Sequence, residues 1–404
     1  MNILFLTLSS FGSLQQKDIY TDLLREFDKN GHKVCIISPV ERRFKVATHI
    51  VKESNATILR LKIGNIQKTK FIEKGISTVM VELLFRKAIQ KYFSNVKFDL
   101  VLYSTPPITF VSAIKFIKER DNAYTYLLLK DIFPQNAVDL GILSKKGLKG
   151  ILYRHFRKQE QQLYNISDRI GCMSQANVDY VIKHNPYVDP KKVEICPNCI
   201  EVIDKSIDEV TRGAVRIKYG IPLDKKVFIY GGNLGKPQGI LFIIECLKKV
   251  ATIKEAFFLI VGDGTEYSKL SDYCDYTNQS NLKLMKRIPK EDFDMLVAAC
   301  DVGLIFLDHR FTIPNFPSRL LSYMQAKLPV LAITDPNTDV GKIIVDGGFG
   351  WWCESSDSNM VVRNIYKIIN NDCRQLGINA YEYVCSNYSS IISYKIIMRF
   401  LETK

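Results

Sequence analysis

The stretch Lys226-Val-Phe-Ile-Tyr-Gly-Gly-Asn-Leu-Gly-Lys-Pro-Gln-Gly-Ile240 decides the fold of this chain. It begins with a short run of β-branched and aromatic residues, which is typical of a buried strand. A glycine-rich turn follows, and residues 240–250 then have the apolar spacing of a helix. A strand, a tight turn and a helix in this order form the repeating unit of a parallel sheet that carries helices on its faces.

The same alternation runs through the whole chain and predicts two α/β domains, each a doubly wound parallel sheet. Residues 201–225 are polar and lack apolar periodicity, so we interpret them as a linker between domains at 1–200 and 226–385. We expect a final helix, near 386–404, to pack back on the first domain. The predicted strands are Asn2–Leu8, Lys33–Ser38, Thr57–Lys62, Asp99–Ser104, Tyr124–Leu129, Arg169–Met173, Lys226–Tyr230, Phe257–Val261, Leu282–Met285, Val302–Phe306 and Val330–Ile333.

The composition suits a folded cytoplasmic protein. Of 404 residues, 47% are hydrophobic and 24% are charged, which excludes wholesale disorder. The longest apolar runs fall far short of the roughly 18 residues that span a bilayer, and no basic segment precedes the first run, so we predict no signal peptide. The ten cysteines are scattered, as expected for buried free thiols in a reducing compartment.

The charge is distributed unevenly along the chain. The formal net charge is +14, and residues 1–200 hold 31 Lys and Arg against 18 Asp and Glu, whereas residues 201–404 hold 25 against 24. A basic N-terminal half suggests an anionic partner, namely a nucleic acid, an anionic membrane or a phosphorylated substrate. The alternative is a basic surface that water simply solvates.

The glycine-rich turn is a candidate anion site. Glycines let the backbone approach a ligand closely, and the free amides of the following helix, together with Lys236, would hold phosphate oxygens. The spacing matches neither a Walker loop nor the dinucleotide-binding G-x-G-x-x-G motif. The alternative is an ordinary tight turn between a strand and a helix.

Two further turns of the second half point to the same chemistry. Gly262-Asp263-Gly264 ends the next predicted strand, so it lies at the same edge of the sheet. Asn315-Phe-Pro-Ser318-Arg319 opens an apolar helix, which places a hydroxyl, free amides and a guanidinium at a helix N-terminus. The alternative for Ser318 and Arg319 is a capped helix with a solvent-facing arginine.

Two turns of the first half carry candidate groups. Asp131 follows the strand 124–129, so we expect it at a carboxyl edge, facing a cleft between the domains, where a carboxylate accepts a proton or orients a sugar hydroxyl. The alternative is that Asp131 caps a helix. Gly12 and Ser13 lie in the turn after the first strand, which is another candidate anion site.

Seven segments, spread in order over nearly the whole chain, resemble the GT-B glycosyltransferases of the retaining family 4. Within that family they look most like the N-acetyl-fucosamine-type transferases of O-antigen and capsule assembly. The segments are Asp18-Ile-Tyr20-Thr-Asp22, Thr105-Pro106-Pro107, Lys130-Asp131-Ile-Phe-Pro-Gln135, Gly171-Cys-Met-Ser174, Gly231-Gly-Asn-Leu-Gly-Lys-Pro-Gln238, Val261-Gly-Asp-Gly264 and Pro317-Ser-Arg319.

The resemblance implies two Rossmann-like domains facing a central cleft, with the donor on the second domain and the acceptor on the first, on the side of Gly12 and Ser13. The implied donor-binding residues contact the diphosphate, the uracil or the ribose of the donor. They are Gly232, Asn233, Lys236, Gln238, Gly262, Asp263, Gly264, Arg287, Ser318, Arg319 and Ser322. One departure stands out, because the two glutamates of the family's E-x7-E motif are replaced here by Pro314 and Ser322. Ser322 retains a hydroxyl for the donor ribose but no charge.

The resemblance also implies the reaction. A sugar, an N-acetylated deoxyhexosamine or a related hexose, would pass from a UDP-sugar to an undecaprenyl-diphosphate-linked saccharide, with no metal or cofactor and, by analogy, with retention. Two alternatives remain open. A UDP-sugar 2-epimerase of the same fold needs paired acid and base residues that we do not find, and a nucleic-acid-binding protein needs a recognition module that the sequence lacks.

Two basic and apolar stretches predict peripheral attachment to the inner face of the plasma membrane. The alternative is that their apolar stripes pack on the sheet. The first combines Lys68, Lys70, Lys74, Arg86, Lys87 and Lys91 with Ile72, Ile76, Val79, Met80 and Leu83. The second combines Lys145, Lys146, Lys149, Arg154, Arg157 and Lys158 with Leu148, Ile151, Leu152 and Phe156.

Overall fold

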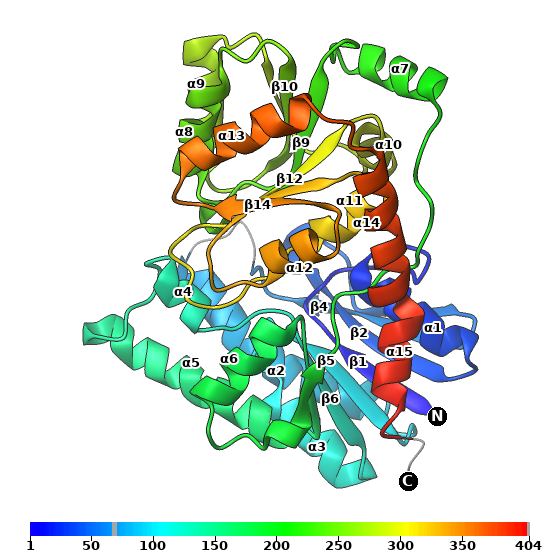
Figure 1. Cartoon of the computed structure of the whole chain (residues 1–404). Coiled ribbons are helices and arrows are strands. Elements are labelled where there is room, and N and C mark those ends of the chain that lie inside the picture. Colours follow the sequence, from blue (N-terminus) through cyan, green and yellow to red (C-terminus); the bar gives the residue numbers. More distant parts are fainter. Residues whose placement is uncertain (67–70, 402–404) are drawn as a thin grey trace. The chain divides into compact units, whose positions relative to one another are not determined.

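A computed structural model describes residues 1–66 and 71–401, and in it the chain divides into two compact units. Unit 1 comprises Met1–Glu201 and Ser390–Lys404, and unit 2 comprises Val202–Ser389. Each unit has its own sheet and its own core, and Figure 1 labels their elements. The chain therefore crosses from unit 1 to unit 2 and returns for its last helix.

Within the described residues, unit 1 contains a sheet of eight strands in the order β3-β4-β2-β1-β5-β6-β7-β8, parallel except for the β3–β4 pair. The strands are β1 (Asn2–Leu6), β2 (Lys33–Glu41), β3 (His49–Glu53), β4 (Ala56–Ile63), β5 (Leu100–Ser104), β6 (Tyr124–Leu129), β7 (Arg169–Cys172) and β8 (Val193–Ile195). The helices are α1 (Ile19–Lys29), α2 (Phe71–Tyr92), α3 (Val111–Asp121), α4 (Gln135–Asp139), α5 (Gly147–Ile166), α6 (Gln175–His184) and α15 (Ser390–Met398).

Helix α15 is held on unit 1 by polar and aromatic contacts with α1. The Tyr394 ring lies edge-on to Phe27 at 4.9 Å, and its hydroxyl is 3.0 Å from Nε2 of His32. At the start of the helix, the Ser390 hydroxyl donates to Glu26 at 3.2 Å. Ile397 and Met398 are buried in the same core as β1 and β2. These contacts make the C-terminal helix part of the N-terminal unit.

Unit 2 contains, over the residues described, a six-stranded parallel sheet in the order β11-β10-β9-β12-β13-β14. The strands are β9 (Lys226–Asn233), β10 (Ala256–Asp263), β11 (Leu282–Met285), β12 (Val302–Phe306), β13 (Val330–Thr334) and β14 (Gly350–Glu354). The helices are α7 (Glu209–Lys218), α8 (Ile240–Val250), α9 (Tyr267–Thr277), α10 (Lys290–Ala298), α11 (Arg319–Gln325), α12 (Val340–Asp346), α13 (Ser358–Ile369) and α14 (Arg374–Asn387).

All the predicted strands are present, and the structure adds β3, β8 and β14. Each added strand lies at an edge of its sheet. An edge strand buries less of its surface than a central one and carries polar residues, as in the His-Ile-Val-Lys-Glu sequence of β3. Its sequence therefore lacks the continuous apolar run by which the central strands are recognised.

The linker interpretation of residues 201–225 is wrong for its middle part, which forms helix α7 on unit 2. Asp208 caps this helix, and Arg216, only 3% exposed, anchors it. Arg216 donates to Asp301 at 2.7 Å and to the Ala299 carbonyl oxygen at 2.8 Å. Asp301 also accepts the Val227 amide, at the start of β9. A buried ion pair, and not an apolar stripe, attaches the helix, so periodicity alone did not reveal it.

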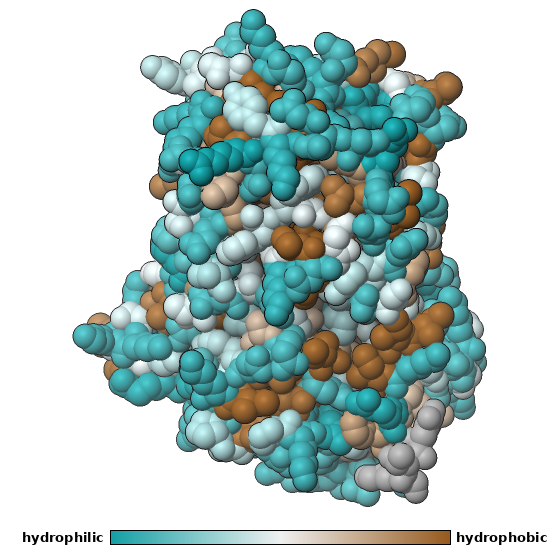
Figure 2. Space-filling view, viewed as in Figure 1, coloured by the Kyte–Doolittle hydropathy of each residue, from teal (hydrophilic) through white to brown (hydrophobic). Residues whose placement is uncertain are grey.

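The surface of α5 is both basic and apolar. Leu148, Ile151 and Leu152 are 87%, 58% and 38% exposed. In Figure 2, hydrophilic and hydrophobic side chains lie side by side around the protruding end of this helix. The alternative that its apolar stripe packs on the sheet therefore fails for these three residues. Exposed cations surround them, namely Lys145, Lys146, Lys149, Arg154 and Lys158.

Two members of that predicted basic cluster have other contacts. The Arg157 guanidinium binds Glu160 and donates to the His184 carbonyl oxygen at 3.0 Å. Phe156 packs on Phe133 at 5.0 Å. Both side chains are partly buried, so neither belongs to the exposed surface as predicted.

The cluster predicted around α2 is described only in part. Lys68 and Lys70 lie outside the described residues, as do the side chains of Ile72, Lys74, Ile76 and Val79. Met80 and Leu83 are about half exposed. None of the helices, over the residues described, is long and apolar enough to cross a membrane.

We predict that Arg216→Ala lowers the free energy of unfolding by about 1.5–3 kcal/mol, because it removes a charged hydrogen bond to Asp301 and the donor of the Ala299 carbonyl oxygen, while Arg212 still pairs with Asp301. Chemical denaturation of the full chain measures the change. The matched control is Lys218→Ala on the same helix, whose pair with Asp292 is exposed at both side chains and screened by water, so we expect little change in stability. Equal effects of the two substitutions would contradict the role of Arg216.

Candidate functional site

The turns after β9 and β10 pack backbone against backbone. A Cβ atom on Gly262 would lie 1.9 Å from the carbonyl oxygen of Gly232, and one on Gly264 would lie 2.3 Å from that of Leu234. The Leu234 amide also donates to the Asp263 carbonyl oxygen at 3.0 Å. No side chain fits between these turns, so both glycines are required for the edge of the sheet to form.

The glycine-rich turn is closed by its own side chains. Oε1 of Gln238 accepts the side-chain amide of Asn233 at 2.9 Å and the backbone amide of Gly235 at 3.1 Å. Gln238 is buried, whereas Asn233 and Lys236 are exposed. In this structure Gln238 therefore supports the turn from within, while Lys236 has no acidic partner among the described residues.

Arg319 lies against the same turn. Its guanidinium stands 4.4 Å from the centre of the Tyr230 ring, and a Cβ on Gly232 would be 3.1 Å from it. Nη1 is buried and has no hydrogen-bond partner within the described part of the chain. Gly232 has a φ of +133°, a conformation that favours glycine. The partly buried Arg319 guanidinium thus lies over the backbone of the glycine-rich turn, and its Nη1 donates no hydrogen bond to the described residues.

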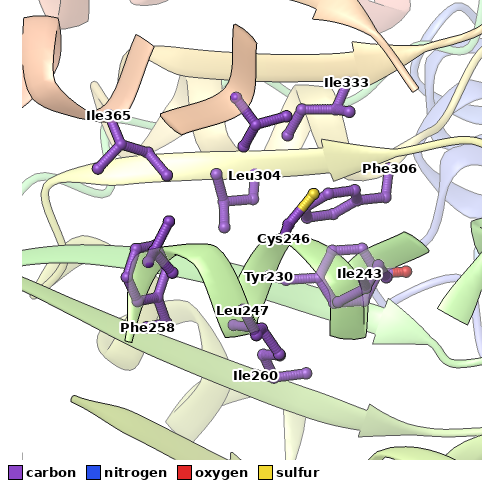
Figure 3. A pocket seen from close by; sticks show the side chains of 12 residues that line it. Tyr230, Ile243, Cys246, Leu247, Phe258, Ile260, Leu304, Phe306, Ile333 and Ile365 are labelled. Atoms are coloured by element: carbon purple, nitrogen blue, oxygen red, sulfur yellow. The ribbon is translucent and has the colours of Figure 1, made fainter. Parts of the chain in front are cut away.

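Tyr230, whose ring faces the Arg319 guanidinium, is buried in the core of unit 2. Figure 3 shows its ring among Ile243, Phe306 and Ile260, around a cavity of about 20 Å³. The cavity has an apolar lining and is too small for a sugar, so we assign it to core packing. The Tyr230 hydroxyl donates to the Asn233 carbonyl oxygen at 2.7 Å, which links the core to the turn. Sequence analysis did not assign a role to Tyr230, although its position directly before Gly231 indicates that it adjoins the turn.

The remaining predicted donor residues are exposed or half-buried. Ser318 is the N-cap of α11, but its hydroxyl makes no capping hydrogen bond. Ser322 lies one turn later and is half-buried, and Arg287 is exposed just beyond β11. Oδ1 of Asp263 accepts the amide of Gly264 at 2.9 Å. Position along the sheet brings these residues to the carboxyl edge of the strands of unit 2.

Asp308, which sequence analysis did not single out, follows β12 and adjoins the glycine-rich turn. Its amide donates to the Pro237 carbonyl oxygen at 2.9 Å, and its carboxylate binds Arg310 through two hydrogen bonds of 2.9 and 2.7 Å. Burial acts to raise the pKa of Asp308, but the bonds to Arg310 outweigh it and hold the pKa below its usual value. The carboxylate next to the turn is therefore charged but neutralised.

Asp131 of unit 1 is a carboxylate in a desolvated setting. Oδ2 accepts the side-chain amide of Asn136 at 2.7 Å, and Oδ1 is buried without a partner among the described residues. Burial raises the pKa of Asp131 to about 6, against the hydrogen bond from Asn136. The alternative that it caps a helix fails, because the N-cap of α4 is Pro134. A carboxyl with this pKa is suited to accept a proton near neutral pH.

Gly12 and Ser13 lie in the loop after β1, which is tied down by polar contacts. The Ser13 hydroxyl donates to Glu53 at 3.1 Å, and the Gly12 amide donates to Gln16 at 3.1 Å. Arg60 of β4 reaches the same loop and donates to the Ser10 hydroxyl at 3.1 Å. Arg60 has no motif around it in the sequence, so only the sheet order brings it to this loop.

The cysteines and acidic residues suggest no further centre. All ten cysteines carry free thiols. In the part of the chain that the structure describes, no group of three or more His, Cys, Asp or Glu side chains is placed to hold a metal ion. Independence of a metal stays a prediction.

Comparison with known proteins agrees with this architecture. Residues 212–383 match the family model described as glycosyl transferases group 1. The probable glycosyltransferase WbjE of Pseudomonas aeruginosa is 27% identical over 82% of this chain and 81% of its own length. The putative colanic acid biosynthesis glycosyl transferase WcaI of Escherichia coli is 23% identical over 61% of this chain and 60% of its own length.

Among solved structures, Anabaena HepE in complex with UDP and glucose matches the whole of both chains, with a TM-score of 0.73 and 14% identity. At that identity the match shows the fold, in which two Rossmann-like units with parallel sheets form the GT-B architecture. The family match over residues 212–383 covers the glycine-rich turn, Arg319 and Ser322. The chain is thus a glycosyltransferase with the GT-B fold, and its residues 212–383 match the group 1 glycosyltransferases.

Proposed function

We propose that the donor is a UDP-sugar bound at the carboxyl edge of the unit 2 sheet. The observation that carries this proposal is the pair of cations around the glycine-rich turn, Lys236 and Arg319, which lack acidic partners among the described residues. Elsewhere in the unit, Lys205 and Lys327 pair with aspartates. A diphosphate supplies the missing negative charge, and the complex of HepE with UDP and glucose supports this choice of ligand.

We propose, further, that the acceptor is an undecaprenyl-diphosphate-linked saccharide bound by unit 1 in capsule or O-antigen synthesis. The sugar transferred is an N-acetylated deoxyhexosamine or a related hexose. The excess of basic residues in 1–200 supports an anionic acceptor. The similarity to WcaI, named for colanic acid biosynthesis, supports a role in polysaccharide assembly.

In this mechanism negative charge develops on the leaving UDP, and groups of the protein that are already oriented stabilise it. Lys236 and Arg319 stabilise that charge. Asp131 accepts the proton of the attacking hydroxyl or orients it. We infer retention of configuration from the family resemblance alone.

We predict that the full chain binds UDP and that Lys236→Ala weakens binding by about 1.5–3 kcal/mol, the usual worth of a hydrogen bond to a charged group. Isothermal titration calorimetry measures both. Lys254→Ala is the control, because Lys254 is exposed just before β10, at the opposite edge of the same sheet. Absence of UDP binding by the wild type, or equal binding by Lys236→Ala, would contradict the donor site.

For Asp131→Asn we expect kcat to fall by about 10²-fold or more, because the proton acceptor is lost. UDP affinity should be unchanged. The unfolding free energy at pH 7 should not fall, since a raised native pKa means that the ionised carboxylate does not stabilise the fold. In the wild type, kcat should decline as the pH drops through about 6, where Asp131 gains a proton. Full activity of the variant would refute the assignment.

We propose that α5 attaches the chain to an anionic membrane surface. Exposed Leu148, Ile151 and Leu152 would enter the lipid interface, and each basic residue near that surface adds about 1 kcal/mol of attraction. Because a physiological Debye length is only about 8 Å, the association should weaken in high salt.

Sedimentation with liposomes tests this surface. We expect binding to vesicles containing phosphatidylglycerol, little binding to phosphatidylcholine alone, and loss of binding when Lys145, Lys146 and Lys149 are changed to Gln. The control changes Lys33, Lys45 and Lys52 to Gln; these exposed lysines lie on or between β2 and β3, at the other end of the sheet from β6 and β7, which α5 connects. Equal binding to both vesicle types, or equal loss in the control, would count against α5.

A further inference from the structure

Arg60 is a cation placed beneath the loop that follows β1. It lies on β4 in register with Ser38 of β2. Its guanidinium donates to the Ser38 hydroxyl at 3.2 Å and to the Ser10 hydroxyl at 3.1 Å. The Ser38 hydroxyl in turn accepts the Phe11 amide at 2.9 Å and donates to the Ser9 carbonyl oxygen at 3.0 Å. The guanidinium is thus fixed by the sheet and by the loop together.

No acidic side chain neutralises Arg60 among the described residues. Three other arginines of this unit that are buried or partly buried pair with carboxylates: Arg25 with Asp22, Arg120 with Asp121, and Arg157 with Glu160. Arg60 has only two hydroxyl partners for its five N–H donors. Burial lowers the pKa of Arg60, since nothing nearby compensates for its desolvation. A partly desolvated cation with unused donors favours an anion from outside the chain.

The loop leaves room for that anion. The residue next to the guanidinium is Gly12, where a Cβ would lie 3.9 Å from Nη1 of Arg60, so a longer side chain would cover the charged group. Ser10, beside it, is exposed. A guanidinium and a hydroxyl beside a residue without a side chain form a cradle for a group with several oxygen acceptors.

We propose that Arg60 and the Ser10 hydroxyl, in the space left open at Gly12, bind an oxyanion of the acceptor, either a phosphate or a sugar carboxylate. The assignment to the acceptor rests on the proposed function, in which unit 1 takes the acceptor. Binding of an oxyanion at this place does not depend on that function. The site would select acceptors that carry negative charge close to the hydroxyl that is glycosylated.

Arginine footprinting tests the oxyanion directly. The full chain is treated with phenylglyoxal alone, with added inorganic pyrophosphate, or with added glucuronate, and modified peptides are quantified by mass spectrometry. We expect one of the two anions to slow modification of Arg60 by at least about fivefold while exposed Arg43 reacts at an unchanged rate. Protection by pyrophosphate identifies a phosphate site, and protection by glucuronate identifies a carboxylate site. Protection by neither anion overturns the proposal.

Kinetics test the assignment to the acceptor. With a lipid-diphosphate-linked saccharide, Arg60→Gln should raise the acceptor KM about tenfold, the scale of one charge-assisted hydrogen bond. The donor KM should be unchanged, and Arg60→Lys should recover part of the loss. Lys33→Gln, at the exposed start of β2, is the matched control with wild-type kinetics.

An unchanged acceptor KM in Arg60→Gln, or a donor KM that rises equally, overturns the assignment. If the wild type transfers no sugar, the proposed function fails, and the footprint still decides whether Arg60 binds an oxyanion. Thermal unfolding of each variant separates loss of the site from loss of the fold.

Discussion

The carboxyl edge of the unit 2 sheet depends on one buried hydroxyl. That of Tyr323 accepts the amide of Gly231 at 3.1 Å and donates toward the carbonyl oxygens of Ile229 and Leu304, at 3.2 and 3.1 Å. It thereby joins α11 to β9 and β12, and it occupies backbone groups that a buried sheet cannot leave unpaired. Because Arg319 and Ser322 lie on the same short helix, this hydroxyl also fixes their position relative to the glycine-rich turn.

The glycines let the backbone of the turn after β9 pack closely on its neighbours, and Lys236 and Arg319 add positive charge beside it. Gly231 packs under Phe293, where a Cβ would lie 2.1 Å from the ring, and Gly262 packs on Gly232. The backbone of the turn is therefore held rigidly with its polar groups at the edge of the sheet. The Tyr230 ring then supports the Arg319 guanidinium from below by a cation–π contact. A site built in advance loses less entropy when a ligand binds than one that must assemble around it.

The sequence predicted the central strands and the residues at their carboxyl ends, because apolar runs and glycine-rich turns are local signals. It did not predict contacts made across the sheet. Arg216 meets Asp301 from 85 positions away, so α7 looked like a linker. Gln238 matched a motif position, but its side chain turns inward to Gly235. Arg60 carries no local pattern, and its place beside Gly12 follows only from the order β4-β2-β1.

The replacement of the acidic pair by Pro314 and Ser322 changes how the proposed donor would be held. A carboxylate at position 322 would give the ribose a charge-assisted hydrogen bond, about twice as strong as the neutral bond that a serine hydroxyl offers. It would also add negative charge near the diphosphate, as Asp308 would if Arg310 did not neutralise it. With Ser322, the ribose of the proposed donor would contribute less, and no carboxylate at position 322 would oppose the diphosphate. In the proposed complex, recognition therefore shifts from the ribose to the diphosphate, which Lys236 and Arg319 are placed to hold.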